Sequence, residues 1–337
     1  MNIRTFALTG LLLQGLLLAA QPADDLVAPF LSRLTLEEKV PTDLLARKSL
    51  LLFDETVTPA DLRQVQRGFQ KTGIDAVIHY PLQLALSAEE ITKQFTEYMV
   101  KREIRFLIFF HKKGSLFEFV FVPFNGKGGW VTDGHSAWQV VGSSLNDMLQ
   151  SIYRTTAATQ KKKNFLISEE PETFVPLRPV STERSEFFAV SLKNDAVAVI
   201  RTGNASFDQR LEALLKEKYP FKVQYFPPGT GTDQLRSKGC FYTLRQIHAS
   251  ASEAMRLLGY SVSASAKTVT TYSFSNGKQG PREIGTETVV WKFYVRHIDS
   301  GNIFLGLKWD ADEDMTRAME NYVQGFQTSL GMEVIKR

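Results

Sequence analysis

The chain has 337 residues, of which 43% are hydrophobic and 24 are phenylalanine, which is enough apolar material for two buried cores. Its formal charge of +4 is small and is not gathered in one part of the sequence, so the composition does not indicate a nucleic-acid partner. Because Cys240 is the single cysteine, no disulfide can form within the chain, and we expect its thiol to be a small buried hydrophobe.

The first twenty residues have the order of a secretory signal peptide. Arg4 is followed by an apolar stretch at 6–18 and by the small residues Ala19 and Ala20. The apolar stretch is short and interrupted for a membrane span, although an uncleaved amino-terminal anchor is the open alternative. We expect cleavage near Ala20, loss of Arg4 so that the formal charge falls from +4 to +3, and a periplasmic or secreted mature protein.

No later stretch offers the ~20 uninterrupted apolar residues that a membrane span needs. The richest one, at 104–124, still carries Arg105, His111 and Glu118. We therefore expect a soluble mature chain with no membrane span after signal cleavage.

A polar lead at 21–45 precedes a first predicted α/β domain at 46–156. Thr58, Pro59 and Asp61 are start signals for a helix, because they supply a capping hydroxyl, a proline at the first position and an acid in the first turn. Ser87 and Glu90 have the spacing of a capping box at the start of a second helix. The predicted elements are strands at 49–53, 74–80, 104–110 and 116–123, and helices at 58–72, 87–99 and 145–153.

Residues 157–185 are rich in lysine, proline and polar side chains, which predicts a linker. The run Lys161–Lys163 would be a solvated face of this linker, with docking of an acidic partner as the alternative.

Residues 186–335 predict a second α/β domain that repeats the first. Its expected elements are strands at 187–192, 195–201, 221–226, 260–275, 286–297 and 303–309, and helices at 206–219, 235–258 and 315–326. Each half would end with a strand, a tight turn, a strand and a helix. A tandem duplication then requires the hairpin at 104–123 to correspond to the one at 286–309.

The expected fold class is therefore α/β with antiparallel edge hairpins, in two tandem related sandwich domains after a signal peptide. Alternating strands and helices favour right-handed crossovers around a parallel core, and each terminal hairpin adds an antiparallel edge. The loops at 125–134 and 275–285 fall outside the pattern, and we expect them to be mobile.

Two segments resemble ligand loops but lack residues that the chemistry needs. The segment 227–232 lies between a strand and a helix as a phosphate-binding loop does, yet no lysine stands between Gly231 and Thr232 to reach the phosphates. Three acids at 310–314 have the spacing that opens a calcium loop, but Met315 replaces the glycine that such a loop requires. We expect a simple turn at the first segment and acids that cap the last helix at the second.

One group of residues is a candidate site. If the strands at 49–53, 74–80 and 104–110 are parallel neighbours, their carboxyl ends share the edge where open α/β sheets bind ligands. The polar residues near those ends are Asp54, Glu55, His79, Tyr80 and His111. Two carboxylates and two imidazoles could hold a divalent metal or perform acid and base catalysis, although strand ends are often polar as they enter solvent.

The first half contains a characteristic order of features. It runs from the acids Asp54 and Glu55 to the helix at 58–72, then from Lys71 through Gly73 into a strand, and then to a second helix and a hairpin that begins at Ile104. In this order of elements, residues 48–156 resemble the domain shared by TPM-type envelope proteins, some of which are reported as phosphatases. The resemblance implies an α/β sandwich on the far side of a membrane, with metal binding by acids.

We expect a non-catalytic exported module that binds an envelope protein or a small ligand, since no complete catalytic set is evident. The alternative is a metal-assisted, phosphatase-like hydrolase. In that case Asp54, Glu55, His79 and His111 would be catalytic, and Asp54, His79 and His111 would hold one divalent metal. No other cofactor is expected, and the sequence leaves the oligomeric state open.

Overall fold

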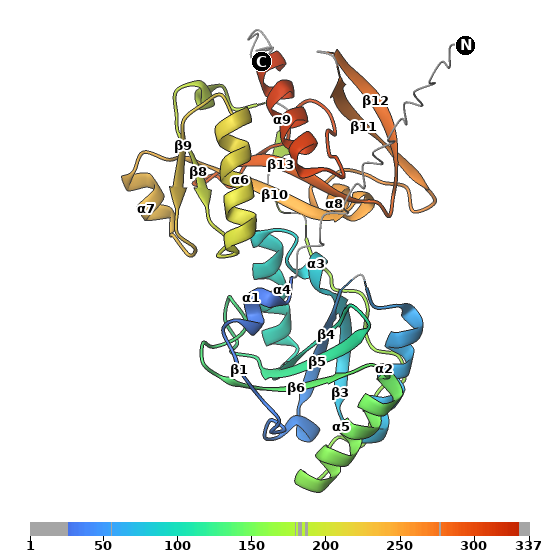
Figure 1. Cartoon of the computed structure of the whole chain (residues 1–337). Coiled ribbons are helices and arrows are strands. Elements are labelled where there is room, and N and C mark those ends of the chain that lie inside the picture. Colours follow the sequence, from blue (N-terminus) through green and yellow to red (C-terminus); the bar gives the residue numbers. More distant parts are fainter. Residues whose placement is uncertain are drawn as a thin grey trace, which may run out of the picture.

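The structure, a computed structural model, describes residues 26–54, 56–178, 180, 184–185, 188–275 and 278–329. The expected signal peptide at 1–20 lies outside these residues. Within them the chain forms two six-stranded mixed sheets and a separate two-stranded ribbon, flanked by helices (Figure 1). The expected α/β fold class is confirmed. No helix in the described ranges is long and apolar enough to cross a membrane.

The N-terminal sheet has the strand order β1-β6-β5-β4-β2-β3. The central strand β2 is parallel to both of its neighbours, β3 and β4. Strand β5 runs antiparallel to β4 and β6, and β1 is parallel to β6. Its strands are β1 (Thr35–Glu37), β2 (Lys48–Phe53), β3 (Asp75–Pro81), β4 (Phe106–Lys113), β5 (Leu116–Pro123) and β6 (Ser136–Gly142).

Helices cover both faces of this sheet. The apolar layer on one face includes Phe69 of α2 and Ile152 of α5, and the layer on the other includes Phe30 of α1 and Phe95 of α4. Successive strand residues alternate between the two layers, as the pleat requires. The helices of this half are α1 (Ala28–Leu31), η1 (Leu44–Ala46), α2 (Pro59–Thr72), α3 (Leu82–Ala85), α4 (Glu89–Lys101) and α5 (Leu145–Thr159).

The C-terminal sheet has the order β7-β14-β13-β10-β8-β9, and its strands are β7 (Arg184–Ser185), β8 (Val197–Ile200), β9 (Val223–Phe226), β10 (Tyr242–Ser250), β13 (Val289–His297) and β14 (Ile303–Phe304). Its helices are η2 (Val190–Lys193), α6 (Ala205–Lys218), α7 (Thr232–Ser237), α8 (Ala251–Leu257) and α9 (Met315–Ser329). The separate ribbon pairs β11 (Thr268–Ser275) with β12 (Lys278–Gly285).

The two sheets have the same strand order and the same relative strand directions. In each, three parallel strands are followed by two antiparallel ones and by an edge strand parallel to its neighbour. This arrangement is what a tandem duplication predicts; the duplication and the division into two domains stay predictions. The C-terminal half differs by inserting residues 251–288 between β10 and β13, where the N-terminal half has only the turn Gly114–Ser115.

The expected helix at 235–258 is wrong. Residues Tyr242–Ser250 form strand β10, which pairs antiparallel with β13 along its whole length. Within 235–258 only residues 235–237, at the end of α7, and Ala251–Leu257 are helical. The physical reason is that pairing with a distant strand overrides a local apolar spacing that fits a helix equally well. As a result, the counterpart of the hairpin at 104–123 is β10 with β13, and the expected correspondence with 286–309 is wrong.

Three smaller expectations also fail. The segment 188–193 contains the short helix η2 instead of a strand, and most of 275–285 is strand β12. The loop at 125–134 is anchored, because Trp130 is fully buried and its Nε1 donates to Thr96 Oγ1 (2.8 Å). Arg33 also donates to the carbonyl oxygens of Gly129 and Val131 (2.9 and 2.8 Å).

The described part of the expected linker is an extended segment, residues 160–178, which we call the strap. Glu172 pairs with the edge strand β3, since it accepts from His79 N–H and donates to Val77 O, both at 2.9 Å. The backbone N–H groups of Lys163 and Asn164 both donate to Leu45 O (3.0 Å). The strap is therefore fixed along the N-terminal sheet by its own backbone.

The two sheets share one apolar cluster, in which residues of α3 and α4 lie with residues of β10, α8 and β13. At its rim, Glu90 Oε1 of α4 lies 3.1 Å from an Arg296 guanidinium nitrogen. Glu90 therefore contributes to the contact between the two sheets.

The expected capping box of Ser87 and Glu90 is absent. Ser87 Oγ donates to Leu84 O instead (2.8 Å), and Ala88 is the residue before the helix.

Candidate functional site

The carboxyl ends of β2, β3 and β4 lie at one edge of the N-terminal sheet, as the candidate site requires. Phe53 is opposite Phe110 of β4 and Pro81 of β3, so Asp54 and His111 are the next residues on neighbouring strands. Helix α2 starts directly after this edge, and its capping box between Thr58 and Asp61 is present as expected.

His79 does not join this group. It lies within β3 opposite Leu51, and its side chain is only 3% exposed. Leu51 belongs to the apolar layer under α2 and α5, so His79 points to that face. His111 follows Phe109 by two residues, and Phe109 belongs to the layer under α1 and α4, so His111 points to the opposite face. The structure therefore does not bring the two imidazoles together.

Burial leaves His79 electrically neutral over a wide pH range. Its removal from water lowers its pKa from 6.5 to about 4. Its Nε2 atom has no hydrogen-bond partner among the described residues. His79 therefore contributes to the core between β3 and α2, where its protonation would be costly.

His111 belongs to a buried hydrogen-bonded chain across three strands. Its Nε2 lies 3.0 Å from Glu118 Oε2 on β5, and Glu118 Oε1 accepts from Gln139 Nε2 on β6 (2.6 Å). The hydrogen bond from His111 outweighs burial and lowers the pKa of Glu118. Sequence reasoning missed Glu118 and Gln139, although an acid inside the apolar run at 116–123 is a visible signal.

Asp54 is held within its own turn. Its Oδ1 accepts from the backbone N–H of Thr56 (3.0 Å) and from the Thr56 hydroxyl. The Thr56 hydroxyl oxygen accepts in turn from the backbone N–H of Lys112 at the end of β4 (3.0 Å). Lys112 Nζ donates to Asp61 Oδ2 at 2.8 Å. Thus Asp54, Thr56, Lys112 and Asp61 link the end of β4 to the start of α2.

Burial raises the pKa of Asp61, but the hydrogen bonds from Lys112 and Thr58 outweigh it, so the pKa is lowered. Glu55, the remaining candidate, lies outside the described residues. In the part of the chain that the structure describes, no group of three or more His, Cys, Asp or Glu side chains is placed to hold a metal ion. The divalent-metal site stays a prediction.

The C-terminal half contains an ion pair that sequence reasoning missed. Lys292 of β13 is fully buried, and its Nζ lies 2.7 Å from Asp310 Oδ1. The same amine donates to the carbonyl oxygens of Phe293 and Leu305, both at 2.7 Å. Because an ammonium group has three donors, Lys292 is saturated and its role is structural. A lysine inside the apolar run at 289–295 was the available signal.

Burial acts on both members of this pair by favouring their neutral forms. It lowers the pKa of Lys292 and raises that of Asp310, while their mutual attraction opposes both changes. Asp310 therefore does not cap the last helix as expected, and neither does Asp312, which pairs with Arg282 (3.2 Å). Asp314 does, since its Oδ1 accepts from the backbone N–H of Arg317 (2.9 Å).

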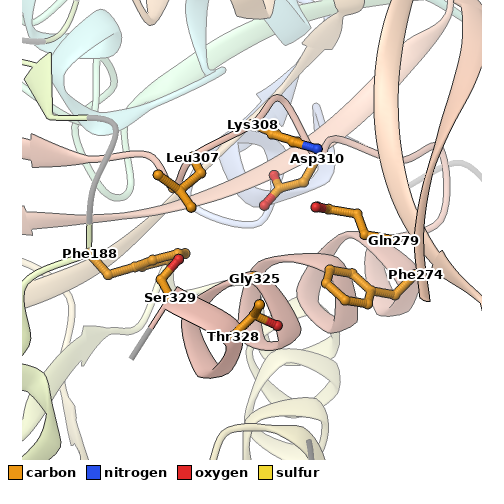
Figure 2. Close-up of a pocket in the computed structure, with 10 residues that line it drawn as sticks. Phe188, Phe274, Gln279, Leu307, Lys308, Asp310, Gly325, Thr328 and Ser329 are labelled. Carbon is orange, nitrogen blue, oxygen red and sulfur yellow. The ribbon is translucent and has the colours of Figure 1, made fainter. Parts of the chain in front are cut away.

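A small pocket opens next to this ion pair, between α9, the loop after β14 and the β11–β12 ribbon (Figure 2). Figure 2 shows the Asp310 carboxylate above the pocket, Gln279 and Phe274 side by side at its right, and Thr328 of α9 below. The pocket has a volume of ≈ 40 Å³. That is room for water molecules, and it is far below the ~300 Å³ at which small-molecule sites begin.

The strap carries the most exposed large apolar side chains among the described residues. Phe165, Leu166 and Phe174 are 77%, 95% and 70% exposed. The three lysines Lys161–Lys163, separated from Phe165 by Asn164, are exposed as well. Since the strap backbone is hydrogen-bonded to the N-terminal sheet, these side chains hold defined positions.

The chain matches no protein-family model, and comparison with curated proteins and with solved structures finds no match either. The resemblance of residues 48–156 to the TPM-type domain therefore stays a prediction.

Proposed function

We propose that this chain is an exported, non-catalytic binding module of the cell envelope, periplasmic or secreted, that holds an acidic partner protein on its strap. The observation that carries this proposal is the exposed pair Phe165 and Leu166 on a fixed backbone. Single exposed apolar residues are common on proteins, whereas contiguous exposed apolar patches mark interaction sites.

The strap supports binding energetically because its backbone is already ordered. Asn164 Nδ2 donates to Gly73 O (3.1 Å), and Lys162 Nζ donates to Gln70 O (3.2 Å). A partner would therefore lose little chain entropy on docking. Burying each of the two apolar side chains would contribute ~1.5–3 kcal/mol.

Charge favours an acidic partner. The exposed lysines Lys161–Lys163 lie just before the apolar pair in the chain, and the acids of the strap, Glu169, Glu170 and Glu172, come after it. The end of the strap next to the apolar pair is therefore basic. A partner with an apolar pocket rimmed by acids fits this surface, since complementary charge steers association and disfavours wrong partners.

Photo-crosslinking tests this proposal. A photoreactive amino acid placed at Phe165 in the full-length chain, expressed in its own cells, should capture one acidic envelope protein. The same group placed at Val190, which is 67% exposed in the C-terminal half, is the matched control and should not capture it. Identical products from both positions, or no protein product at Phe165, would refute docking at the strap.

The alternative function, a metal-assisted phosphatase, has one observation in its favour. The buried His111 and Glu118 pair lies at the carboxyl edge of parallel strands beside Asp54, where a base oriented by a carboxylate could act. The test is hydrolysis of a phosphomonoester by the purified mature protein, with and without zinc or manganese. Turnover that disappears in both Asp54→Ala and His111→Ala would favour this function over binding alone.

A further inference from the structure

A cavity in the C-terminal half is built by a single insertion. It has a volume of ≈ 250 Å³ and is lined by Ser252, Glu253, Arg256, Tyr260, Val262, Ser263, Ala264, Ala266, Thr286 and Glu287. All ten residues lie in 251–288, between β10 and β13. The equivalent connection in the N-terminal sheet is the turn Gly114–Ser115, so the cavity belongs to what the C-terminal half adds to the shared topology.

The insertion holds this cavity in shape by joining its two ends. The backbone N–H of Ala251 donates to Thr288 O (2.8 Å), and that of Ser252 donates to Thr286 O (3.0 Å). The Thr286 N–H donates in turn to Lys267 O (3.0 Å), which fixes the far wall. Tyr260 packs edge to face on Trp309, with ring centroids 5.3 Å apart. A preformed cavity with fixed walls is what small ligands require.

The charges in the cavity wall exclude anions. All three nitrogens of the Arg256 guanidinium already donate hydrogen bonds. Nε donates to Glu253 Oε2 (2.8 Å), Nη2 donates to Glu253 Oε1, and Nη1 donates to Leu177 O (3.1 Å). With Glu253 and Glu287 against Arg256, the lining residues carry a formal charge of −1. A phosphate or carboxylate would find no uncommitted cation among them and would lose its hydration.

The remaining groups suit a ligand with many hydroxyls. The carboxylate oxygens of Glu253 and Glu287 accept hydrogen bonds, and the hydroxyls of Ser252 and Ser263 both donate and accept. A sugar hydroxyl also donates and accepts, so one ring can use several of these groups at once. Val262, Ala264 and Ala266 offer an apolar wall for the C–H face of such a ring.

We propose that this cavity binds one ring of a neutral sugar. Its volume lies just below the ~300–1,000 Å³ range of small-molecule sites, which fits a single ring better than a chain of several rings. Arg256 in the cavity wall contacts Leu177 near the end of the strap, but none of the ten lining residues belongs to the strap, and the site does not depend on partner docking at Phe165. A small-ligand site in the inserted segment would give the C-terminal half a function that the N-terminal half lacks.

Calorimetric titration of the purified mature chain tests this proposal, with D-glucose, D-galactose and N-acetyl-D-glucosamine as probes and inorganic phosphate and putrescine as comparison ligands. At least one sugar should bind saturably, and the two comparison ligands should not. Ala264→Trp fills the cavity from an exposed position, so it should weaken sugar binding at least tenfold. Ser261→Trp, at an exposed position of the same loop outside the lining, is the matched control and should bind as the unchanged protein does.

Three results would overturn the sugar site: no saturable binding of any of the three sugars, equal binding by both tryptophan variants, or saturable binding of putrescine or phosphate alone. Thermal unfolding of each variant is measured alongside. Because both substitutions lie on the surface of the same loop, matching unfolding temperatures would assign a loss of binding to the filled cavity. A loss of binding in Ala264→Trp together with collapse of its unfolding temperature counts against the fixed cavity that the proposal requires.

Discussion

Replacing His79 with leucine should make the protein more resistant to acid. Burial lowers the pKa of His79 to about 4, whereas the same side chain in the unfolded chain titrates near ~6.5. The unfolded state therefore takes up a proton at a pH where the folded state does not. The stabilising effect of a neutral His79 on the unfolding free energy is therefore complete above pH ~6.5, and it is lost as the pH falls toward 4.

The size of this effect follows from the two pKa values. The full difference corresponds to ~3 kcal/mol of unfolding free energy below pH 4, and to ~2 kcal/mol at pH 5. Urea unfolding followed by circular dichroism at pH 7.5, 6 and 5 measures it. The unchanged protein should lose ~2 kcal/mol more than His79→Leu between pH 7.5 and 5. His135→Leu, at an exposed histidine, is the control and should keep the full loss. Equal pH dependence in His79→Leu and the unchanged protein would refute the reasoning.

Other parts of the structure give further predictions. Lys292→Met should destabilise the protein by ~3–5 kcal/mol in urea unfolding, because it leaves Asp310 buried without its cation. The double variant Lys292→Met, Asp310→Leu should recover most of that loss. A cost of under ~1 kcal/mol for Lys292→Met alone would contradict the buried pair. Thr58→Ala should cost ~1 kcal/mol by removing the α2 cap, and no change would mean that the capping box is not formed. Export predicts an envelope-fraction protein whose mass lacks residues 1–20, and a full-length cytosolic protein would contradict it.

The sequence predicted best the elements that carry their own local signals. Helix α2 begins at a capping box between Thr58 and Asp61, and it ends at Gly73, whose φ of +99° is readily accepted only by glycine. Strand β10 has no such local signal. Its identity depends on nine residue pairs with β13, whose members are 39 to 55 residues apart in the chain. Leu244 and Ile247 alone fit a helix equally well.

The candidate site was predictable in its strand order but not in its faces. The three parallel strands are neighbours as expected, yet the pairing of β2 with β3 shifts between Ser49 and Leu50, which leaves Val77 as an extra residue in β3. One extra residue moves every later side chain to the other face. It therefore directs His79 away from His111. No residue type marks such a shift in the sequence, and the Glu118 partner of His111 likewise becomes evident only through strand pairing.

The measurement that tests the proposed function most directly is the affinity of the partner captured at Phe165 for variants of the strap. The double variant Phe165→Ser, Leu166→Ser should bind the purified partner at least a hundredfold more weakly, since it removes ~3 kcal/mol or more of apolar burial. Reversing Lys161–Lys163 to glutamate should slow association and weaken its dependence on salt. Val190→Ser, at a position in the C-terminal half that is 67% exposed, should leave the affinity unchanged. Equal affinity of all three variants, or binding to anionic lipid vesicles in place of the protein, would contradict the proposed function.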